Sequence, residues 1–135
     1  IKVTSPYSVQ YSNQIRVETS KPYLVNRTIQ TGFLGTTIDE QDIATIKFVD
    51  EGTIPPPGVL GSFDVSDGKK GNVIAWYTKN ADDPTSYDVV ISANGKINIK
   101  KTEFLFSNLM LLVEVDLTNT DISEASSFRA TFFNI

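Results

Sequence analysis

The stretch VIAWYT at residues 73–78 is the clearest β-strand pattern in the chain, because it combines β-branched and aromatic residues next to turn-forming neighbours. A polar loop, residues 79–86, follows it. Two more β runs come next, Tyr87–Ile91 and Lys96–Ile99, and the Asn94-Gly95 pair between them is typical of a hairpin turn. These runs predict a β-sheet in the middle of the chain, with one face of the last run exposed to water.

The residues before this region predict another strand and one short helical turn. Ile43–Val49 has a strongly apolar face and is expected to be a strand. The segment Glu51–Gly58 contains three successive prolines, which favour an extended, rigid connector. Thr37 is expected to cap a turn or short helix that carries three acidic residues, Asp39, Glu40 and Asp42.

The first thirty residues alternate between apolar and polar side chains, as strands do. Ile1–Thr4 and Ile15–Glu18 predict short antiparallel strands of a half-solvated sheet, and Pro6 and Pro22 interrupt this segment. The alternative is an aromatic ligand platform formed by the rings of Tyr7, Tyr11 and Tyr23.

The pattern changes after Lys101. Thr102 is expected to cap a short helix. The residues spaced to form one apolar side of that helix are Phe104, Leu105, Asn108 and Leu109. The next stretch is close to the register of a leucine-rich repeat, whose positions are occupied by Leu112, Val115, Leu117 and Thr120. The asparagine of the repeat pattern, Asn119, comes one place early. Phe106 and Phe132 would be equivalent positions of successive repeats, about 26 residues apart.

The composition excludes several classes of function. The 135 residues include no cysteine and no histidine, which excludes disulfide scaffolds, thiol nucleophiles, histidine-based triads and Cys/His zinc sites. The formal net charge of -4 and the three widely separated arginines argue against a nucleic-acid surface. No apolar run is long enough to span a bilayer. We therefore expect no cofactor, no nucleic-acid partner and no membrane insertion.

Carboxylate pairs are the best candidates for an enzymatic site, because glycoside hydrolysis uses two acids. The available pairs are Asp64/Asp67, Asp82/Asp83 and Glu114/Asp116. Turn chemistry also explains the aspartates of the loops, and the solvent-exposed face of a strand explains Glu114 and Asp116. We expect none of these carboxylates to be catalytic.

Three other motifs have both a functional and a structural interpretation. Asp64–Gly68 partly matches a calcium-binding loop but lacks its spacing and terminal glutamate, so a turn is favoured. Asn26-Arg27-Thr28 is an N-glycosylation sequon, which in a bacterial protein would normally carry no sugar. Trp76 is a candidate binding aromatic, but its apolar neighbours indicate a buried or half-buried ring. No catalytic, cofactor-binding or metal-binding residue is assigned.

Seven segments carry a resemblance to a known family, and they are Phe33–Thr37, Ile43–Val49, Asp64–Ser66, Gly71–Tyr77, Ile91–Ile97, Leu105–Leu109 and Val115–Ser123. Their order resembles the start of the BspA-like leucine-rich-repeat surface proteins. In that family a small capping module precedes the stacked repeats, and the members are mostly secreted or attached to the cell wall and are linked to adhesion.

The resemblance implies a mostly β, α+β capping domain that leads into the start of a leucine-rich-repeat solenoid. We expect an N-terminal β segment at residues 1–32, an α+β capping module at 33–101, and the first repeat with the start of the next at 102–135. The end at Ile135 is then not a natural terminus, and the chain is expected to be a piece of a longer repeat protein.

The expected function is that of a non-catalytic module of a bacterial cell-surface or secreted protein. It would cap the repeat array and support adhesion to a protein or glycan ligand, and the fragment would be a monomer. The Thr- and Asn-rich, cysteine-free composition is typical of surface proteins of Gram-positive bacteria. The alternatives are a structural module of a secreted assembly or phage tail, and a fragment of a carbohydrate-active enzyme.

Overall fold

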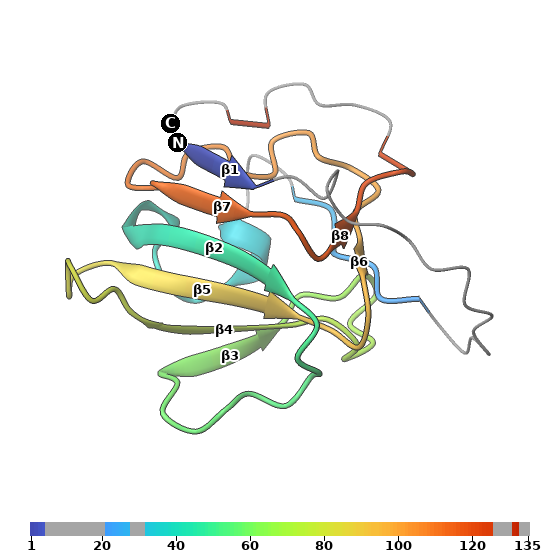
Figure 1. The fold of residues 1–135 in the computed structure, drawn as a ribbon, viewed down its shortest axis with the longest axis horizontal. Coiled ribbons are helices and arrows are strands. Elements are labelled where there is room, and N and C mark those ends of the chain that lie inside the picture. Colours follow the sequence, from blue (N-terminus) through green and yellow to red (C-terminus); the bar gives the residue numbers. More distant parts are fainter. Residues whose placement is uncertain (5–20, 28–31, 126–130, 133–135) are drawn as a thin grey trace.

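Six strands form one mixed sheet in the computed structural model, which describes residues 1–4, 21–27, 32–125 and 131–132 (Figure 1). The spatial order is β1-β7-β2-β5-β4-β3. The first four strands in that order are parallel, β4 is antiparallel to β5, and β3 is antiparallel to β4. The strands are β1 (Lys2–Thr4), β2 (Ile43–Val49), β3 (Gly61–Asp64), β4 (Ile74–Lys79), β5 (Tyr87–Ser92) and β7 (Glu114–Asp116).

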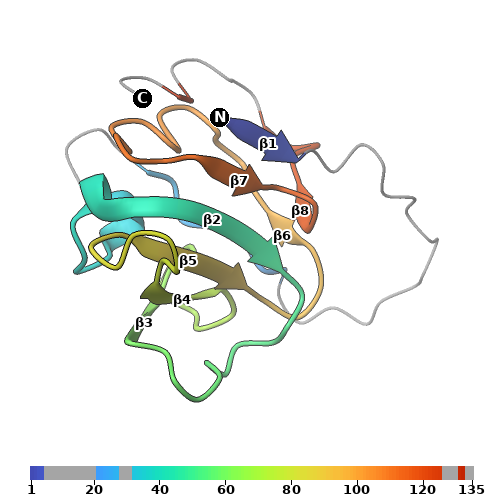
Figure 2. The same cartoon turned by 60° about the vertical axis from the view of Figure 1, so that its left-hand side comes forward.

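A second, smaller sheet pairs β6 (Ile97–Asn98) with β8 (Thr120–Asp121) in parallel. Figure 2 shows these two strands side by side beyond the carboxyl ends of β5 and β7. The helical elements of the described ranges are two short 3-10 helices, η2 (Phe33–Gly35) and η3 (Glu40–Asp42). The expectation of a mostly β fold is therefore confirmed, whereas helix is limited to these two turns.

Strand β2 is central because both of its edges are paired and most of its side chains are buried. Ile46 lies between Val89 of β5 and Val115 of β7, and all three side chains are almost completely buried. Parallel strands covered in this way carry nearly continuous apolar runs, which explains the sequence IATIKFV. The strand predicted at Ile43–Val49 is confirmed with the same bounds.

The hairpin predicted around Asn94-Gly95 is wrong. β5 is already paired on both edges, by β2 and β4, so no edge is left for the following strand. β6 instead leaves the large sheet and pairs with β8. The strand predicted at Val73–Thr78 is confirmed as β4, and its antiparallel partner β3 was not predicted.

The helix predicted from Thr102 is also wrong. Residues 103–108 form successive turns, and Phe104 and Asn108 have left-handed backbone angles, with φ of 58° and 63°. A right-handed helix cannot contain such residues. The chain must turn here because it crosses from β5 to β7, and a crossover between parallel strands usually uses a helix. In this molecule the crossover consists of turns and β6.

The N-terminal expectations are met in part. The strand at Ile1–Thr4 is present as β1, but it is parallel to β7 rather than antiparallel to a neighbour. Ile15–Glu18 lies outside the described residues. The short acidic helix is present as η3, and Asp39 caps it by accepting a hydrogen bond from the Gln41 N–H, in place of Thr37. No strand or helix occurs in Glu51–Gly58, as predicted for a connector.

The burial pattern of β2 predicts that alanine substitutions at two adjacent positions change the free energy of unfolding by very different amounts. Ile46→Ala should lower the free energy of unfolding by about 2–5 kcal/mol, because Ile46 is 1% exposed and its loss leaves a cavity. Lys47→Ala, on the exposed face of the same strand, should change it by less than about 0.5 kcal/mol. Urea unfolding of both variants measures this, and equal effects would contradict the assignment of the two faces.

Candidate functional site

The Asp64 carboxylate is used within its own loop. One oxygen accepts hydrogen bonds from the Ser66 N–H (2.9 Å) and the Ser66 hydroxyl (2.5 Å), and the other accepts one from the Gly71 N–H (3.0 Å). Burial by itself would raise the pKa of Asp64, but these hydrogen bonds, together with the charge of Lys69, lower it below 3.8. The loop is therefore a turn closed by an aspartate, as predicted, and Asp67 contributes its N–H to the Tyr23 carbonyl.

Asp82 and Asp83 also lie in a self-contained turn. The Asn80 side-chain oxygen accepts hydrogen bonds from the backbone N–H groups of both aspartates. The Asp83 carboxylate accepts hydrogen bonds from Thr85 and Ser86, which lower the pKa of Asp83. This is the turn chemistry that the sequence predicted.

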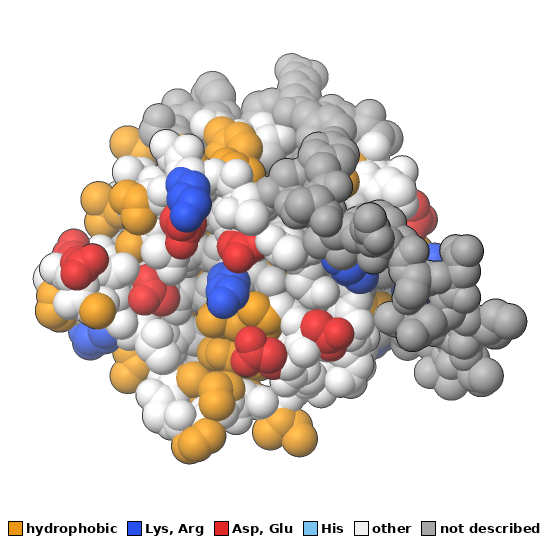
Figure 3. Space-filling view, viewed as in Figure 1, with side chains coloured by type: hydrophobic (Ala, Val, Ile, Leu, Met, Phe, Trp, Pro, Cys, Tyr) orange, Lys and Arg blue, Asp and Glu red, His pale blue; other side chains and the backbone are white. Residues whose placement is uncertain are grey.

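Glu114 and Asp116 occupy one face of β7, on either side of the buried Val115. Glu114 forms an exposed ion pair with Lys2 of β1 (3.3 Å), and Asp116 accepts the Thr118 N–H (2.9 Å). Acidic and basic side chains are interspersed on the face of the molecule shown in Figure 3. The pair therefore lies on a solvated face, as predicted.

The other candidate positions are also structural. Trp76 is 4% exposed, so its ring presents little surface to a ligand. Asn26 of the sequon is exposed, whereas Thr28 lies outside the described residues, as do Tyr7 and Tyr11 of the proposed aromatic platform. Within the described residues, no group of three or more acidic side chains is placed to hold a metal ion. No described helix is long and apolar enough to cross a membrane.

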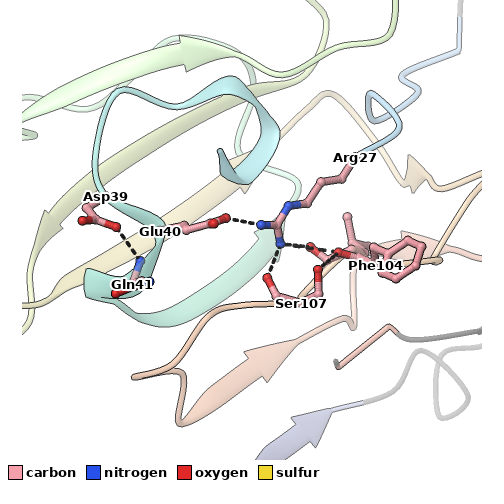
Figure 4. Close-up of polar contacts among 7 residues, drawn as sticks. Arg27, Asp39, Glu40, Gln41, Phe104 and Ser107 are labelled. Atoms are coloured by element: carbon pink, nitrogen blue, oxygen red, sulfur yellow. Dashed lines mark hydrogen bonds and ion pairs between the residues drawn. The ribbon is translucent and has the colours of Figure 1, made fainter. Parts of the chain in front are cut away.

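Arg27 is the most buried charged side chain of the described residues, and it joins three segments (Figure 4). Its Nη1 donates to the carbonyl oxygens of Ser107 (2.6 Å), Leu105 (3.2 Å) and Phe104 (3.4 Å). Its Nη2 forms an ion pair with Glu40 of η3. Burial lowers the pKa of Arg27, and the Glu40 carboxylate partly offsets that effect.

This cluster, which we call the Arg27 clamp, stabilises the irregular crossover. Within the turn at residues 104–108, the Phe104 carbonyl accepts hydrogen bonds from the N–H and the hydroxyl of Ser107. Arg27 supplies donors to the Leu105 and Ser107 carbonyls as well, which are not part of a helix. The planar guanidinium offers several donors in a fixed geometry and suits a buried position of this kind. Sequence reasoning missed Arg27, because nothing in its local sequence distinguishes a buried arginine from a surface one.

Three chain segments stack at the carboxyl ends of the parallel strands, and we call them corners: residues 50–52, 93–96 and 117–119. The Gly52 N–H donates to the Ala93 carbonyl (3.1 Å), and the Gly95 N–H donates to the Asp50 carboxylate (2.8 Å). On the other side, the Asn119 side chain donates to the Gly95 carbonyl (2.9 Å), and the Ile97 N–H donates to the Asn119 carbonyl (3.0 Å). The predicted position Asn119 therefore bonds the turn of the neighbouring chain segment.

An apolar cavity of about 200 Å³ lies next to the last corner. The ring of Phe132 stacks on Phe106, with centroids 5.4 Å apart, and the Phe106 N–H donates to the Thr131 carbonyl (2.9 Å). The two residues predicted to be equivalent positions of successive repeats are thus in contact. The lining residues are Ile99, Thr102, Leu105, Phe106, Leu117, Ile122, Thr131 and Phe132.

A row of exposed apolar side chains lies at the β1 edge of the sheet, and we call it the edge strip. It comprises Ile1 before β1, Val3 of β1, and Met110, Leu111 and Val113 before β7, each more than two fifths exposed. The two parts are adjacent, because the Lys2 N–H donates to the Val113 carbonyl. Figure 3 shows hydrophobic side chains at the upper left, where Figure 1 places the loop before β7.

The cavity and the edge strip together form the candidate functional site. The cavity lining is almost entirely apolar, so the cavity suits an apolar group. Exposed apolar side chains gathered at one place indicate a contact surface for another polypeptide.

The Arg27 clamp predicts a graded series of stabilities. Arg27→Ala should lower the free energy of unfolding by roughly 3–5 kcal/mol, because it removes the partner of Glu40 and the guanidinium donor to the Leu105 and Ser107 carbonyls. Arg27→Lys keeps the charge but loses the planar fork, and should show an intermediate loss. Asn26→Ala, a change at the exposed neighbour, is the control. If urea unfolding gave Arg27→Ala the same free energy of unfolding as Asn26→Ala, the stabilising role of the Arg27 clamp would be contradicted.

The Asp64 turn predicts an acid-sensitive contribution to stability. The folded carboxyl has a pKa below its unfolded value of 3.8, so its stabilisation is complete above that pH and is lost as pH falls through the folded pKa. Asp64→Asn should therefore reduce the loss of stability on acidification below pH 3.8, relative to Asp82→Asn at an exposed loop position. Thermal unfolding at a series of pH values measures the stability of each variant. The same pH dependence of stability in both variants would contradict the stabilising role of the Asp64 carboxylate.

Comparison with family models, with curated proteins and with solved structures found no significant match. The resemblance to the BspA-like proteins therefore stays a prediction from the sequence.

Proposed function

We propose that the chain is a non-catalytic module that caps an array of leucine-rich repeats in a bacterial cell-surface or secreted protein. The observation that carries the proposal is the apolar cavity at one end of the core, beside the last of three stacked corners. An array of repeats requires a cap because each repeat buries its apolar face only against its neighbours. A module with an apolar cavity at one end of its core fits that need.

The stacking of the corners supports the proposal. Asn119 and Gly95, which join two corners by a hydrogen bond, are 24 residues apart in the chain. That separation lies within the usual repeat length of about 20–29 residues. Ile97 of β6 and Thr120 of β8 are register partners in successive segments of this kind. The Phe106–Phe132 contact is what equivalent positions of stacked repeats would make.

The edge strip supplies the second argument. Soluble proteins rarely leave a contiguous apolar surface uncovered unless it meets a partner. The strip lies at the β1 edge of the sheet, on β1 and the segment before β7, so a further repeat could cover it together with the cavity. The capped array would then present its own surface to a protein or glycan ligand, which is the adhesive role we propose.

The direct test locates the native polypeptide that contains this sequence. An antibody against the module should detect a surface-attached or secreted polypeptide, and mass spectrometry should find further repeats of roughly 25 residues in it. A cytosolic polypeptide without such repeats would contradict the proposal. A trimer of the module in light scattering would instead favour a structural role in a secreted assembly.

A pair of variants tests the candidate surface in the native polypeptide. Val113→Lys places a charge in the edge strip and should make the residues that follow the module more sensitive to protease, because the charge opposes packing of the next repeat. Ile54→Lys is the matched control, since Ile54 is 84% exposed and lies in the connector before β3. Equal sensitivity of the two variants would exclude the edge strip as the contact surface.

A further inference from the structure

Asn94-Gly95 is the only Asn-Gly pair of the sequence, and the function proposed above gives the Asn94 side chain no role. It lies in the corner between β5 and β6, where Asn94 is exposed and Gly95 has a φ of 91°. Only glycine adopts such an angle readily, so the turn requires glycine at position 95.

An exposed Asn-Gly pair can modify itself in water. The Gly95 amide nitrogen loses its proton to the solvent and attacks Cγ of Asn94; a C–N bond forms, and the Cγ–Nδ2 bond breaks. Nδ2 leaves as ammonia after taking a proton from water, and a succinimide ring remains. Water then opens the ring at either carbonyl, which produces aspartate or isoaspartate. Glycine favours the reaction because no side chain shields its nitrogen.

The structure holds both backbone polar groups of Gly95, one on each side of its Cα atom. The Gly95 N–H donates to Oδ1 of Asp50, at the end of β2, over 2.8 Å. The Gly95 carbonyl accepts the Asn119 side chain over 2.9 Å. A carboxylate beside an N–H opposes loss of the proton, since the product would be a second negative charge. These two hydrogen bonds, to residues of different corners, also resist the backbone rotation that would bring the Gly95 nitrogen to Cγ of Asn94.

We propose that Asn94 is a deamidation site that Asp50 and Asn119 keep unreactive in the folded module. The reaction proceeds when this corner opens locally, so its rate reports the opening of the corner. The product matters to the fold, because isoaspartate inserts an extra methylene into the main chain directly before Gly95. That insertion displaces Gly95 from Asn119 and disturbs the pairing of β6 with β8.

The test measures deamidation by peptide mapping and an isoaspartate assay after incubation at mildly alkaline pH. The folded protein should deamidate at Asn94 at least roughly tenfold more slowly than the same protein in urea. Asp50→Ala should bring the folded rate toward the rate in urea, and Asp82→Ala, at an exposed loop position, should leave it unchanged.

Two results would overturn the proposal: equal rates in the folded and urea-treated wild type, or an Asp50→Ala rate as slow as wild type. Circular dichroism checks that the variant is folded. If Asp50→Ala unfolds, Asp50→Asn keeps the shape of the side chain and removes only the charge. It should then deamidate faster than wild type while folded, and a rate equal to wild type would refute the role of the carboxylate.

Discussion

Arg27 donates hydrogen bonds to the carbonyl groups of an irregular turn that lies between two parallel strands. Its guanidinium reaches Phe104, Leu105 and Ser107, and it is paired with Glu40 of η3. This contact allows the chain to cross between parallel strands without a helix, which is the usual connection. The position of β7 beside β2 depends on that crossover, and so does the position of the apolar cavity.

The corners provide hydrogen-bond partners for the backbone at the carboxyl ends of the parallel strands. Backbone groups that leave a sheet must find partners, and here each corner bonds to the next one. Asp50 and Asn119 supply side chains on either side of Gly95. The apolar cavity lies beside the last of these corners, with Leu117 and Ile122 in its lining.

Local sequence patterns predicted the individual strands well and their pairing poorly. β2 and β4 were predicted because their β-branched and aromatic runs are long. β3 was missed because Gly61–Asp64 contains a single large apolar side chain, Phe63. The Asn94-Gly95 hairpin failed because turn chemistry says only that the chain turns. It does not say whether the preceding strand still has a free edge.

The sequence by itself determined the absence of histidine and cysteine chemistry, the aspartate-closed turns and the alternation that exposes Glu114 and Asp116, because these depend on residue type and near neighbours. Only the tertiary structure decided that Arg27 is a buried clamp and that Phe106, Leu117 and Phe132 line one cavity. Those contacts join residues that are far apart in the chain, and the free energy of such pairings leaves no local pattern.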